Sequence, residues 1–359
     1  MTSEPALRIG VVGAGAFAAA CHLPGLLRHP GARVVAICGR RPQRAAEVAA
    51  RFGIAAVGAD AAELVARSDV DAVTICTPNA AHREAAVLAF QHGKHVFCEK
   101  PLAAALADAQ AMAAAAQASG RVHQVAFTYR YLHGVGELRR RVRAGDVGEP
   151  FLFRVHHEFW DGLRPGAPIG WRELRQPAGG GVLYDSGSHF FDLARFVLGP
   201  IAAVRADLQH VPRRRREAAS GETRDVETDD RAACWFRFAS GVHGEWHASR
   251  VTPPRAENSV VVVGREGALA ALLSRGRLDG LRAARPGEAE WEELPLPAEA
   301  GDGEAHALWR MMGSFVDACR RGSLAEADAS FADGLAAQRA IAAAEAAADS
   351  GWARLEPPA

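Results

Sequence analysis

The sequence predicts an α/β protein of two domains, in which a parallel sheet covered by helices is followed by an open, mostly antiparallel sheet. Through the first third of the chain, short apolar runs rich in β-branched residues alternate with helical patterns. After about residue 128, strand-like runs follow one another with turn residues between them. The chain of 359 residues is also longer than the roughly 250 at which a single core usually stops growing. We expect the domains to span residues 1–127 and 128–359.

Five runs in the first domain are expected to be strands, because each is short, apolar and bounded by turn residues or helical patterns. They are residues 7–12, 33–38, 72–76, 95–98 and 122–127. Helical patterns fill the gaps, as at 43–52 and 80–92. Strands that alternate with helices in this way form a parallel sheet with helices on both faces.

The second domain is expected to have few helices. They are residues 134–144, 304–321 and 331–349, the last capped by Ser330 with Asp333 three residues on. The expected strands are residues 151–160, 201–211, 232–239, 242–251 and 259–263. Residues 212–228 are polar and charged, which predicts a mobile loop, with the arginines at 213–216 facing solvent.

The charge balance restricts the possible partners. The chain has 42 Lys+Arg and 42 Asp+Glu, whereas nucleic acid or an anionic membrane would favour a basic excess, so neither is expected as a partner. The six cysteines form no C-x-x-C pair, and no signal or membrane segment is predicted, which favours a cytoplasmic protein with reduced thiols. No metal site is expected, because no H-E-x-x-H motif or Cys/His cluster is present.

A glycine-rich turn follows the first expected strand. Residues 13–18 read Gly-Ala-Gly-Ala-Phe-Ala, which fits G-x-G-x-x-G/A. In that pattern Gly13 allows the tight turn, Gly15 lets the backbone approach a pyrophosphate, and the small Ala18 lets helix and strand pack closely. Ala16 and Phe17 complete the expected cofactor turn. At the head of a series of β-α units, this turn predicts a Rossmann dinucleotide-binding domain.

The end of the second strand bears on the choice between NADP and NAD. An NAD site usually has Asp or Glu there to bind the adenosine ribose, but this chain has Arg40 and Arg41. A guanidinium can hold a 2′-phosphate with two hydrogen bonds, so NADP is favoured and NAD is the alternative. The other possibility is that both arginines stack on adenine or face solvent.

The fourth strand ends in a polar turn at the edge where ligands bind in open α/β sheets. Thr77, Pro78 and Asn79 are expected cofactor contacts, although Asn79 could equally be a helix N-cap. His82 is interpreted as a residue of the helix surface or as a packing contact near the cofactor.

Several segments in order resemble the glucose-fructose oxidoreductase, inositol dehydrogenase and rhizopine-catabolism (Gfo/Idh/MocA) family. They are Gly-Ala-Gly-Ala at 13–16, Thr-Pro-Asn-Ala-Ala-His at 77–82, Gly-Lys-His-Val-Phe-Cys-Glu-Lys-Pro at 93–101, the glycines 179–181, and Asp-Ser-Gly-Ser-His-Phe-Phe-Asp at 185–192. The resemblance covers almost the whole chain. It implies a Rossmann domain followed by an α/β domain with an open, mostly antiparallel sheet that often forms subunit contacts. It also implies NAD or NADP, and oxidation or reduction of a hydroxyl-bearing carbon on a sugar, cyclitol or related polyol.

The resemblance assigns the reaction centre. Lys100 follows the fifth strand, beside Glu99, at the expected position of the nicotinamide. The resemblance makes Lys100 a catalytic residue, whose amine offsets charge at the substrate oxygen. The alternative is a structural pair between Lys100 and Glu99. In this family the bond before the proline of Glu-Lys-Pro is often cis.

A second group of candidates follows the glycines at 179–181. Asp185, His189 and Asp192 would share one face of a helix, because their spacing is i, i+4 and i+7. By resemblance His189 is the general base and Asp185 its partner or a substrate ligand, while Asp192 caps or braces the helix. A metal site or a purely structural His-Asp pair are the alternatives.

The remaining candidates are expected to line the substrate cleft or to pack between the domains. Tyr129 and Arg130 follow the last strand of the first domain, and Trp171 and Arg172 precede the glycines. His156, His157, Trp160 and Asp161 are weaker candidates near a strand end.

The sequence is therefore interpreted as an NAD(P)-dependent oxidoreductase, with Lys100 and His189 handling the proton and a homodimer or homotetramer expected. The alternatives are an enzyme that retains its NAD and cleaves a glycosidic bond, and a non-catalytic nucleotide sensor.

Overall fold

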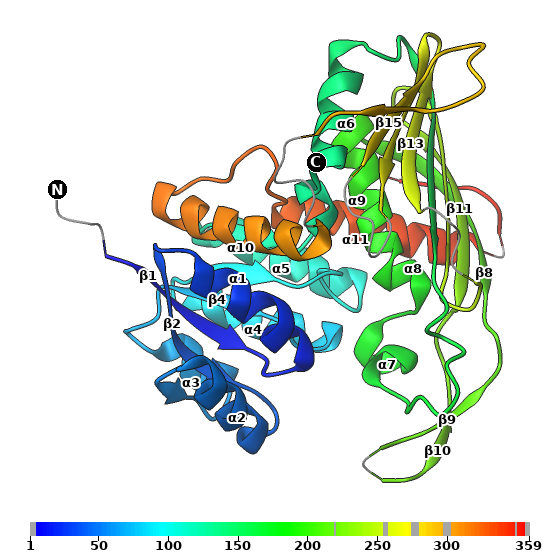
Figure 1. Cartoon of the computed structure of the whole chain (residues 1–359). Helices are drawn as coiled ribbons and strands as arrows, with labels where there is room; N and C mark the ends of the chain where they lie inside the picture. Colours follow the sequence, from blue (N-terminus) through cyan, green and yellow to red (C-terminus); the bar gives the residue numbers. More distant parts are fainter. Residues whose placement is uncertain are drawn as a thin grey trace. The chain divides into compact units, whose positions relative to one another are not determined.

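Two structural units make up the chain (Figure 1). The computed structural model describes residues 5–218, 220–253, 258–273, 280–296, 303–348 and 350–355. Unit 1 comprises residues 1–128 and 305–335, and unit 2 comprises residues 129–304 and 336–359. The segment 305–335 differs from the sequence prediction, which placed it in the second domain. It belongs to unit 1 because its apolar side chains complete that core, as where the Phe315 ring meets the edge of Phe97.

The sheet of unit 1 has the order β3-β2-β1-β4-β5-β6, and each adjacent pair is parallel. This is the doubly wound order of a Rossmann fold. The strands are β1 (Leu7–Val12), β2 (Ala32–Cys38), β3 (Ala56–Val57), β4 (Ala72–Ile75), β5 (His95–Cys98) and β6 (His123–Val125). The five predicted strands are present, and β3 is too short to stand out in the sequence pattern.

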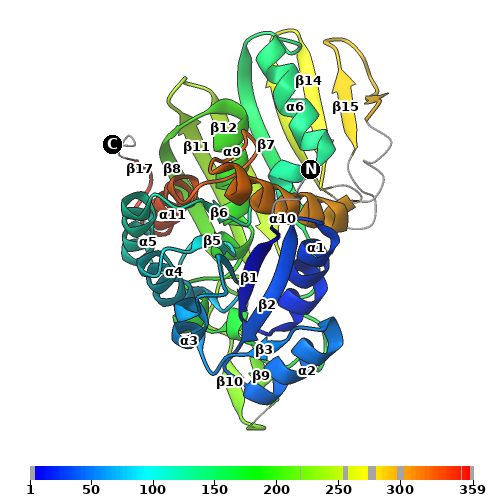
Figure 2. The ribbon, with the colours of Figure 1, turned by 90° about the vertical axis from the view of Figure 1, so that its left-hand side faces the viewer.

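Helices cover both faces of this sheet. Figure 2 shows α1 and α2 on one side of it and α4 and α5 on the other. The helical segments of unit 1 are a π-helical turn η1 (Ala18–His22), α1 (Leu23–Arg28), α2 (Pro42–Phe52), α3 (Ala61–Ala66), a 3₁₀ turn η2 (Asn79–Ala81), α4 (His82–Gln91), α5 (Leu106–Ser119) and most of α10 (Gly303–Arg321). The carboxyl ends of β1, β4 and β5 lead into the predicted cofactor segments, because neighbouring parallel strands end at the same edge.

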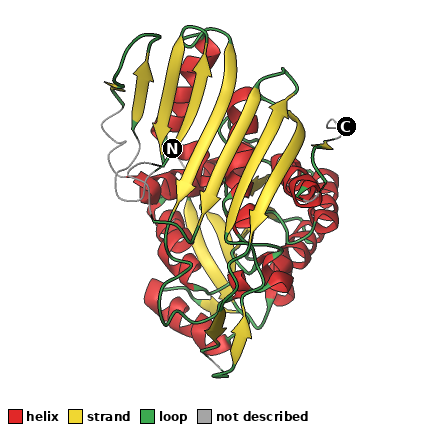
Figure 3. Ribbon diagram, turned by 90° about the vertical axis from the view of Figure 1, so that its right-hand side faces the viewer, coloured by secondary structure: helices red, strands yellow, loops and turns green. Residues whose placement is uncertain are grey.

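Unit 2 is built on a nine-stranded sheet of order β16-β15-β14-β13-β7-β12-β11-β8-β17. All adjacent pairs are antiparallel except β12 and β7, which are parallel. The strands are β7 (Pro150–Glu158), β8 (Ile201–Gln209), β11 (Arg231–Phe238), β12 (His243–Ser249), β13 (Ser259–Gly264), β14 (Gly267–Leu272), β15 (Leu281–Ala284), β16 (Glu292–Leu294) and β17 (Ala353–Arg354). Figure 3 shows one face of this sheet without helices in front of it. The predicted open, mostly antiparallel sheet is confirmed.

Helices pack against one face of the nine-stranded sheet. The longer ones that contact strands are α6 (His133–Ala144) and α9 (Gly187–Leu198), and shorter α8 (Val182–Asp185) also contacts them. Trp246 of β12 is fully buried between the Phe190 and Phe191 rings of α9. The other helical segments are the 3₁₀ turns η3 (Thr128–Tyr131) and η4 (Trp171–Glu173), α7 (Arg175–Ala178) and α11 (Phe331–Ala347). As predicted, Ser330 precedes α11 and exchanges hydrogen bonds with Asp333.

The expected mobile loop at 212–228 is instead partly a β-hairpin. Strands β9 (Arg214–Arg216) and β10 (Thr223–Asp225) pair in antiparallel fashion. The prediction of solvent-facing arginines is also wrong for Arg213 and Arg215. Arg213 forms an ion pair with the fully buried Asp230, and Arg215 donates to the carbonyl of Gly162. A polar sequence pattern could not reveal these partners, because they are distant in the chain.

Candidate functional site

The glycine-rich turn is formed by backbone that side chains would disrupt. Gly13 has φ = 111°, a left-handed conformation that favours glycine, and a Cβ there would lie 2.8 Å from the carbonyl oxygen of Cys76. Its N–H donates to the carbonyl of Cys38 at 2.9 Å. The turn is thereby tied to the ends of both β2 and β4.

Two observations at this edge fit a bound dinucleotide. A Cβ on Gly15 would meet nothing within 4 Å, so packing within the protein does not require glycine there. Open space at this point leaves room for the pyrophosphate that the motif predicts. The Thr77 hydroxyl oxygen, just after β4, is buried and has no hydrogen-bond partner among the described residues. A buried polar atom of this kind usually has a partner, and a cofactor could supply one.

Arg40 and Arg41 are both exposed at the end of β2. Gly39 lies against the glycine-rich turn, because a Cβ at Gly39 would be 3.1 Å from the nitrogen of Ala14. The two arginines therefore follow directly on backbone that packs against the predicted pyrophosphate turn. Phe17 is also exposed there, at 40%.

The turn after β4 decides between alternatives that the sequence left open for Asn79 and His82. Asn79 is the first residue of η2, where the flanking N-cap position is Pro78 and no side chain caps the turn. His82 is fully buried rather than on the helix surface. Its Nε2 lies 3.0 Å from the Thr77 carbonyl oxygen, and its Nδ1 lies 3.2 Å from the carbonyl oxygens of Pro101 and Leu102. Both ring nitrogens therefore face backbone.

Lys100 follows β5 at the same edge and is half-buried. The Lys100-Pro101 peptide bond is cis, as the resemblance implies. The preceding Glu99 is buried and forms an ion pair with His22, with 2.8 Å between Oε1 and Nε2. Sequence reasoning missed His22. The available signal was a histidine one turn beyond the glycine-rich motif, within an otherwise apolar stretch.

Unit 2 carries the second group of candidates, and its helix is interrupted. The sequence predicted that Asp185, His189 and Asp192 share one face, but α8 ends at Asp185 and α9 begins at Gly187. The Ser188 hydroxyl donates to the Asp185 carbonyl oxygen at 3.1 Å, a group that would otherwise accept within a continuous helix. Asp185 is thus at a helix end, whereas His189 lies within the next helix.

The Tyr129 ring packs against His189. The two rings stack with 4.4 Å between centroids and 27° between planes. The Tyr129 hydroxyl lies 3.5 Å from Nε2 of the buried His157. Tyr129 thus contacts two other candidates from the sequence, the predicted base His189 and the weaker candidate His157.

Arg130 and Asp192 form a buried bidentate ion pair. Arg130 Nε lies 2.8 Å from Oδ2 of Asp192, and Nη2 lies 2.6 Å from Oδ1. Their side chains are 5% and 1% exposed. Arg130, predicted as a substrate contact, thus has an internal partner, and Asp192 braces η3 rather than its own helix.

Trp171 and Arg172 lie in η4, with the Arg172 guanidinium 4.4 Å from the Trp171 ring centroid. The turn is fixed by its neighbour Glu173, whose carboxylate accepts from the Gly170 N–H at 2.8 Å and pairs with Arg215. The Arg172 carbonyl accepts from the Thr228 hydroxyl at 3.0 Å.

The last of the glycines at 179–181 serves a close backbone approach. A Cβ at Gly181 would lie 1.9 Å from the Asp229 carbonyl oxygen. The Asp229 carboxylate accepts from the N–H groups of Gly181 and Leu183, and thereby caps α8. Burial raises the pKa of Asp229.

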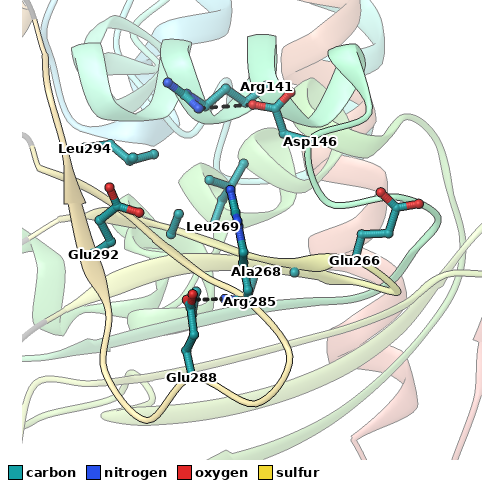
Figure 4. A pocket seen from close by; sticks show the side chains of 12 residues that line it. Arg141, Asp146, Glu266, Ala268, Leu269, Arg285, Glu288, Glu292 and Leu294 are labelled. Carbon is teal, nitrogen blue, oxygen red and sulfur yellow. Dashed lines mark hydrogen bonds and ion pairs between the residues drawn. The ribbon is translucent and has the colours of Figure 1, made fainter.

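A cavity of about 210 Å³ in unit 2 involves none of the predicted site residues (Figure 4). It lies between the end of α6 and strands β14 to β16, and its lining includes Arg141, Asp146, Glu266 and Glu292. Within the described ranges, no group of three or more His, Cys, Asp or Glu side chains could hold a metal ion. No helix in the part of the chain that the structure describes has the length and apolarity to cross a membrane.

Stability is expected to fall in mild acid because of three histidines in unit 1, of which His82 is buried and His95 and His123 are partly buried. Burial lowers the pKa of His82, His95 and His123. In an unfolded chain a histidine takes up its proton near pH 6.5. Below that pH the unfolded state binds more protons than the folded state, so the free energy of unfolding decreases as pH falls. Urea unfolding at pH 7.5 and 5.5 should show a loss on the order of 1 kcal/mol per pH unit. Equal or higher stability at pH 5.5 would contradict this expectation.

Two family profiles match the chain. Residues 7–127 match the oxidoreductase family with an NAD-binding Rossmann fold, and residues 135–270 match the GFO/IDH/MocA C-terminal domain. The 1,5-anhydro-D-fructose reductase of Ensifer adhaerens is 34% identical over 262 residues, which cover 73% of this chain and 74% of that enzyme. The levoglucosan dehydrogenase of Pseudarthrobacter phenanthrenivorans is 34% identical over 227 residues, which cover 60% of this chain and 58% of that enzyme.

The likeness extends to the whole fold. A structure of levoglucosan dehydrogenase in complex with NADH and L-sorbose superimposes with a TM-score of 0.89 at 28% identity, covering 98% of this chain and 99% of that one. The profiles together span more than half of the chain, and they match the two units in order. The chain therefore belongs to the GFO/IDH/MocA family of oxidoreductases.

Proposed function

We propose that this oxidoreductase transfers hydride between a nicotinamide dinucleotide and a secondary alcohol or ketone carbon of a sugar, cyclitol or related polyol. The observation that carries the proposal is the position of Lys100, at the carboxyl end of β5 on the edge that also holds the glycine-rich turn. Relatives named for levoglucosan, 1,5-anhydro-D-fructose and scyllo-inositol support the substrate class.

Composition further supports a chemical role for Lys100. The chain has 42 Lys+Arg, but lysine occurs only at positions 94 and 100. Lys94 has a structural role, because its Nζ donates to the carbonyls of Arg67 and Val70 at 2.9 and 2.7 Å. An ammonium can release a proton, whereas a guanidinium stays protonated in proteins. The use of lysine rather than arginine at position 100 therefore supports the proposed role of Lys100 in proton transfer.

The bound dinucleotide would supply the hydride acceptor or donor. Lys100 would donate a hydrogen bond to the substrate oxygen and offset its negative charge as the hydroxyl proton leaves. His189 would hold that proton at a ring nitrogen, with the Tyr129 ring fixing the plane of the imidazole. Asp185 would orient His189 or bind a substrate hydroxyl.

The cofactor is proposed to be NADP, with NAD as the alternative. Support comes from the exposed Arg40 and Arg41 at the end of β2, where an NAD site would usually have a carboxylate. Relatives of known structure contain NADH, so this chain would differ from them in its 2′-phosphate contact.

Replacing Arg40 by Asp is expected to shift the preference from NADP toward NAD by about tenfold or more, because a bidentate charged contact becomes a repulsion. The ratio of kcat/KM for the two cofactors measures the shift. Arg44→Asp, on the exposed face of α2 and paired with Glu47, is the control and should leave the ratio unchanged. An unchanged ratio in the Arg40 variant would refute the 2′-phosphate contact.

The function is tested by following reduction of NADP and NAD at the nicotinamide absorbance across a panel of sugars, inositols, sugar acids and diols. Substrate-dependent reduction of a free dinucleotide would support the proposal. Cofactor that survives gel filtration, with glycoside cleavage and no net reduction, would favour the NAD-retaining alternative. Dinucleotide binding without turnover on any panel member would favour the sensor.

The oligomeric state is proposed from one face of the nine-stranded sheet, and the cellular compartment from the state of the cysteines. The face of the nine-stranded sheet away from α9 carries half-exposed side chains such as Arg154, Glu245 and Trp235, and we propose that a second copy covers it in a homodimer or homotetramer. All six cysteines are free thiols, which supports a reducing, cytoplasmic compartment.

A further inference from the structure

We infer that two buried histidines, His22 and His82, are positioning residues that hold the Lys100-Pro101 turn from its two sides. The inference rests on the proposed catalytic role of Lys100. His22 acts on the residue before the lysine, through Glu99. His82 faces the two residues after it, through their carbonyl groups. The three contacts belong to segments far apart in the sequence, so they fix the turn against the rest of unit 1.

His22 is attached to the dinucleotide side of the sheet. It is the last residue of the π-helical turn η1, which begins directly after the glycine-rich turn, and its side chain is fully buried. The edges of Phe17 and Phe97 meet the imidazole at centroid distances of 5.8 and 5.5 Å. The orientation of the imidazole is therefore fixed both by packing against these two rings and by the hydrogen bond to Glu99.

Glu99 transmits this constraint to the lysine. Its Oε1 pairs with His22 at 2.8 Å, while its Oε2 accepts the backbone N–H of Lys100 at 3.3 Å. The Lys100 peptide is therefore held by a carboxylate whose other oxygen is held by His22. π-Helical turns are rare in proteins, and those that occur are often found at functional sites. Here the π-helical turn brings His22 next to Glu99, the residue before the proposed catalytic lysine.

His82 constrains the other side of the turn. Two carbonyls, of Pro101 and Leu102, lie 3.2 Å from Nδ1, and the Thr77 carbonyl lies 3.0 Å from Nε2. Nδ1 is therefore the ring atom that contacts the segment after the lysine, and Nε2 is the one that contacts the turn after β4.

The two histidines matter for rate more than for binding. Lys100 is a half-buried lysine whose side chain must reach one atom of the substrate, so a shift of its backbone moves the ammonium directly. A displacement of about 1 Å at a reacting group can cost on the order of 100-fold in rate. The glycine-rich turn is held by its own backbone, through the bond from the Gly13 N–H to the Cys38 carbonyl, and neither histidine takes part in that bond.

The test uses two pairs of variants, because Asn and Gln each place an amide N–H near only one ring nitrogen of histidine. The Gln amide nitrogen approximates Nε2, and the Asn amide nitrogen approximates Nδ1. At position 22 the bond to Glu99 uses Nε2. His22→Gln should therefore keep kcat near the wild-type value, while His22→Asn should lower it about tenfold or more. At position 82 the contact with the turn uses Nδ1, so His82→Asn should keep kcat near the wild-type value and His82→Gln should lower it.

Three further measurements separate positioning from folding. Melting temperature reports stability. Dinucleotide affinity, measured by tryptophan fluorescence, should change by less than about twofold in His22→Asn and His82→Gln, the two variants expected to lose a contact with the turn. Since lysine occurs only twice, mass spectrometry of amine-reactive labelling reports Lys100 directly. Its labelling rate should change in His22→Asn and His82→Gln. The control is His95→Asn. His95 is a half-buried histidine at the opposite end of β5, and its ring accepts the Val122 N–H, so this variant should leave kcat and Lys100 labelling unchanged.

The outcomes distinguish this inference from the proposed function. Equal kcat and equal Lys100 labelling within each Asn/Gln pair, or the reverse pattern of rescue, would overturn the inference. If Lys100→Ala retained full activity, the proposed function would fail instead. Loss of activity in Lys100→Ala, together with unchanged His22 and His82 variants, would leave the function standing and remove the positioning role.

Discussion

Replacing Lys100 by alanine is expected to lower kcat by about 100-fold or more, while the dinucleotide still binds. The reason is that the amine is proposed to stabilise charge on the reacting oxygen, an interaction stronger in the transition state than in the ground state. Steady-state kinetics with the substrate found in the panel, together with dinucleotide titration, measures both quantities. Loss of dinucleotide affinity with unchanged kcat would assign Lys100 to cofactor binding alone.

A matched variant separates charge from proton transfer. Lys100 is proposed to handle the proton together with His189 as well as to stabilise charge. Lys100→Arg keeps a cation at this position but cannot release a proton, so it should remain about as slow as the alanine variant. His189→Ala should show a comparable loss of about 100-fold. If Lys100→Arg regained most of the activity, charge stabilisation would explain the role of Lys100 and proton transfer would not.

Replacing Asp192 by alanine is expected to reduce the free energy of unfolding by about 3–5 kcal/mol. The substitution leaves the Arg130 guanidinium buried at 5% exposure without its bidentate partner. Chemical denaturation followed by fluorescence measures the loss. Replacing the pair together, with Arg130→Met and Asp192→Leu, should recover much of it, because no uncompensated charge then remains.

An exposed ion pair in the same unit provides the control. Arg265 and Glu149 are 75% and 72% exposed, so Glu149→Ala should change stability by less than about 1 kcal/mol. A loss in Asp192→Ala as small as that in the control would show that the buried pair is not a major support of η3. That result would instead favour the role that the sequence predicted for Arg130, a contact with the substrate.

Much of unit 1 follows from local sequence patterns. Apolar β-branched runs marked five of its six strands, and the glycine-rich turn marked the first crossover. The conformation of Gly13 is a local requirement, so a motif can specify it. Lys100 and the turn at 77–79 could also be located, because they follow strands directly and the ends of parallel strands meet at one edge.

Less of the candidate site in unit 2 could be predicted from the sequence. Helical spacing grouped Asp185 with His189 on one helix, whereas the structure places them in two helices, α8 ending at Asp185 and α9 beginning at Gly187. The stacking of Tyr129 on His189 joins residues 60 positions apart, and neither periodicity nor composition encodes such a pair. Arg213 and Arg215 were predicted to face solvent for the same reason, since their carboxylate partners Asp230 and Glu173 lie outside the polar segment 212–228.

The amino-acid sequence by itself determined the fold class, the cofactor turn and the identity of the lysine, because each depends on neighbours within a few residues. Only the tertiary structure decided which charged and aromatic groups meet: His22 with Glu99, His82 with the turn after Lys100, and Arg130 with Asp192. A buried polar group must find a partner when water is removed, and folding selects that partner from the whole chain.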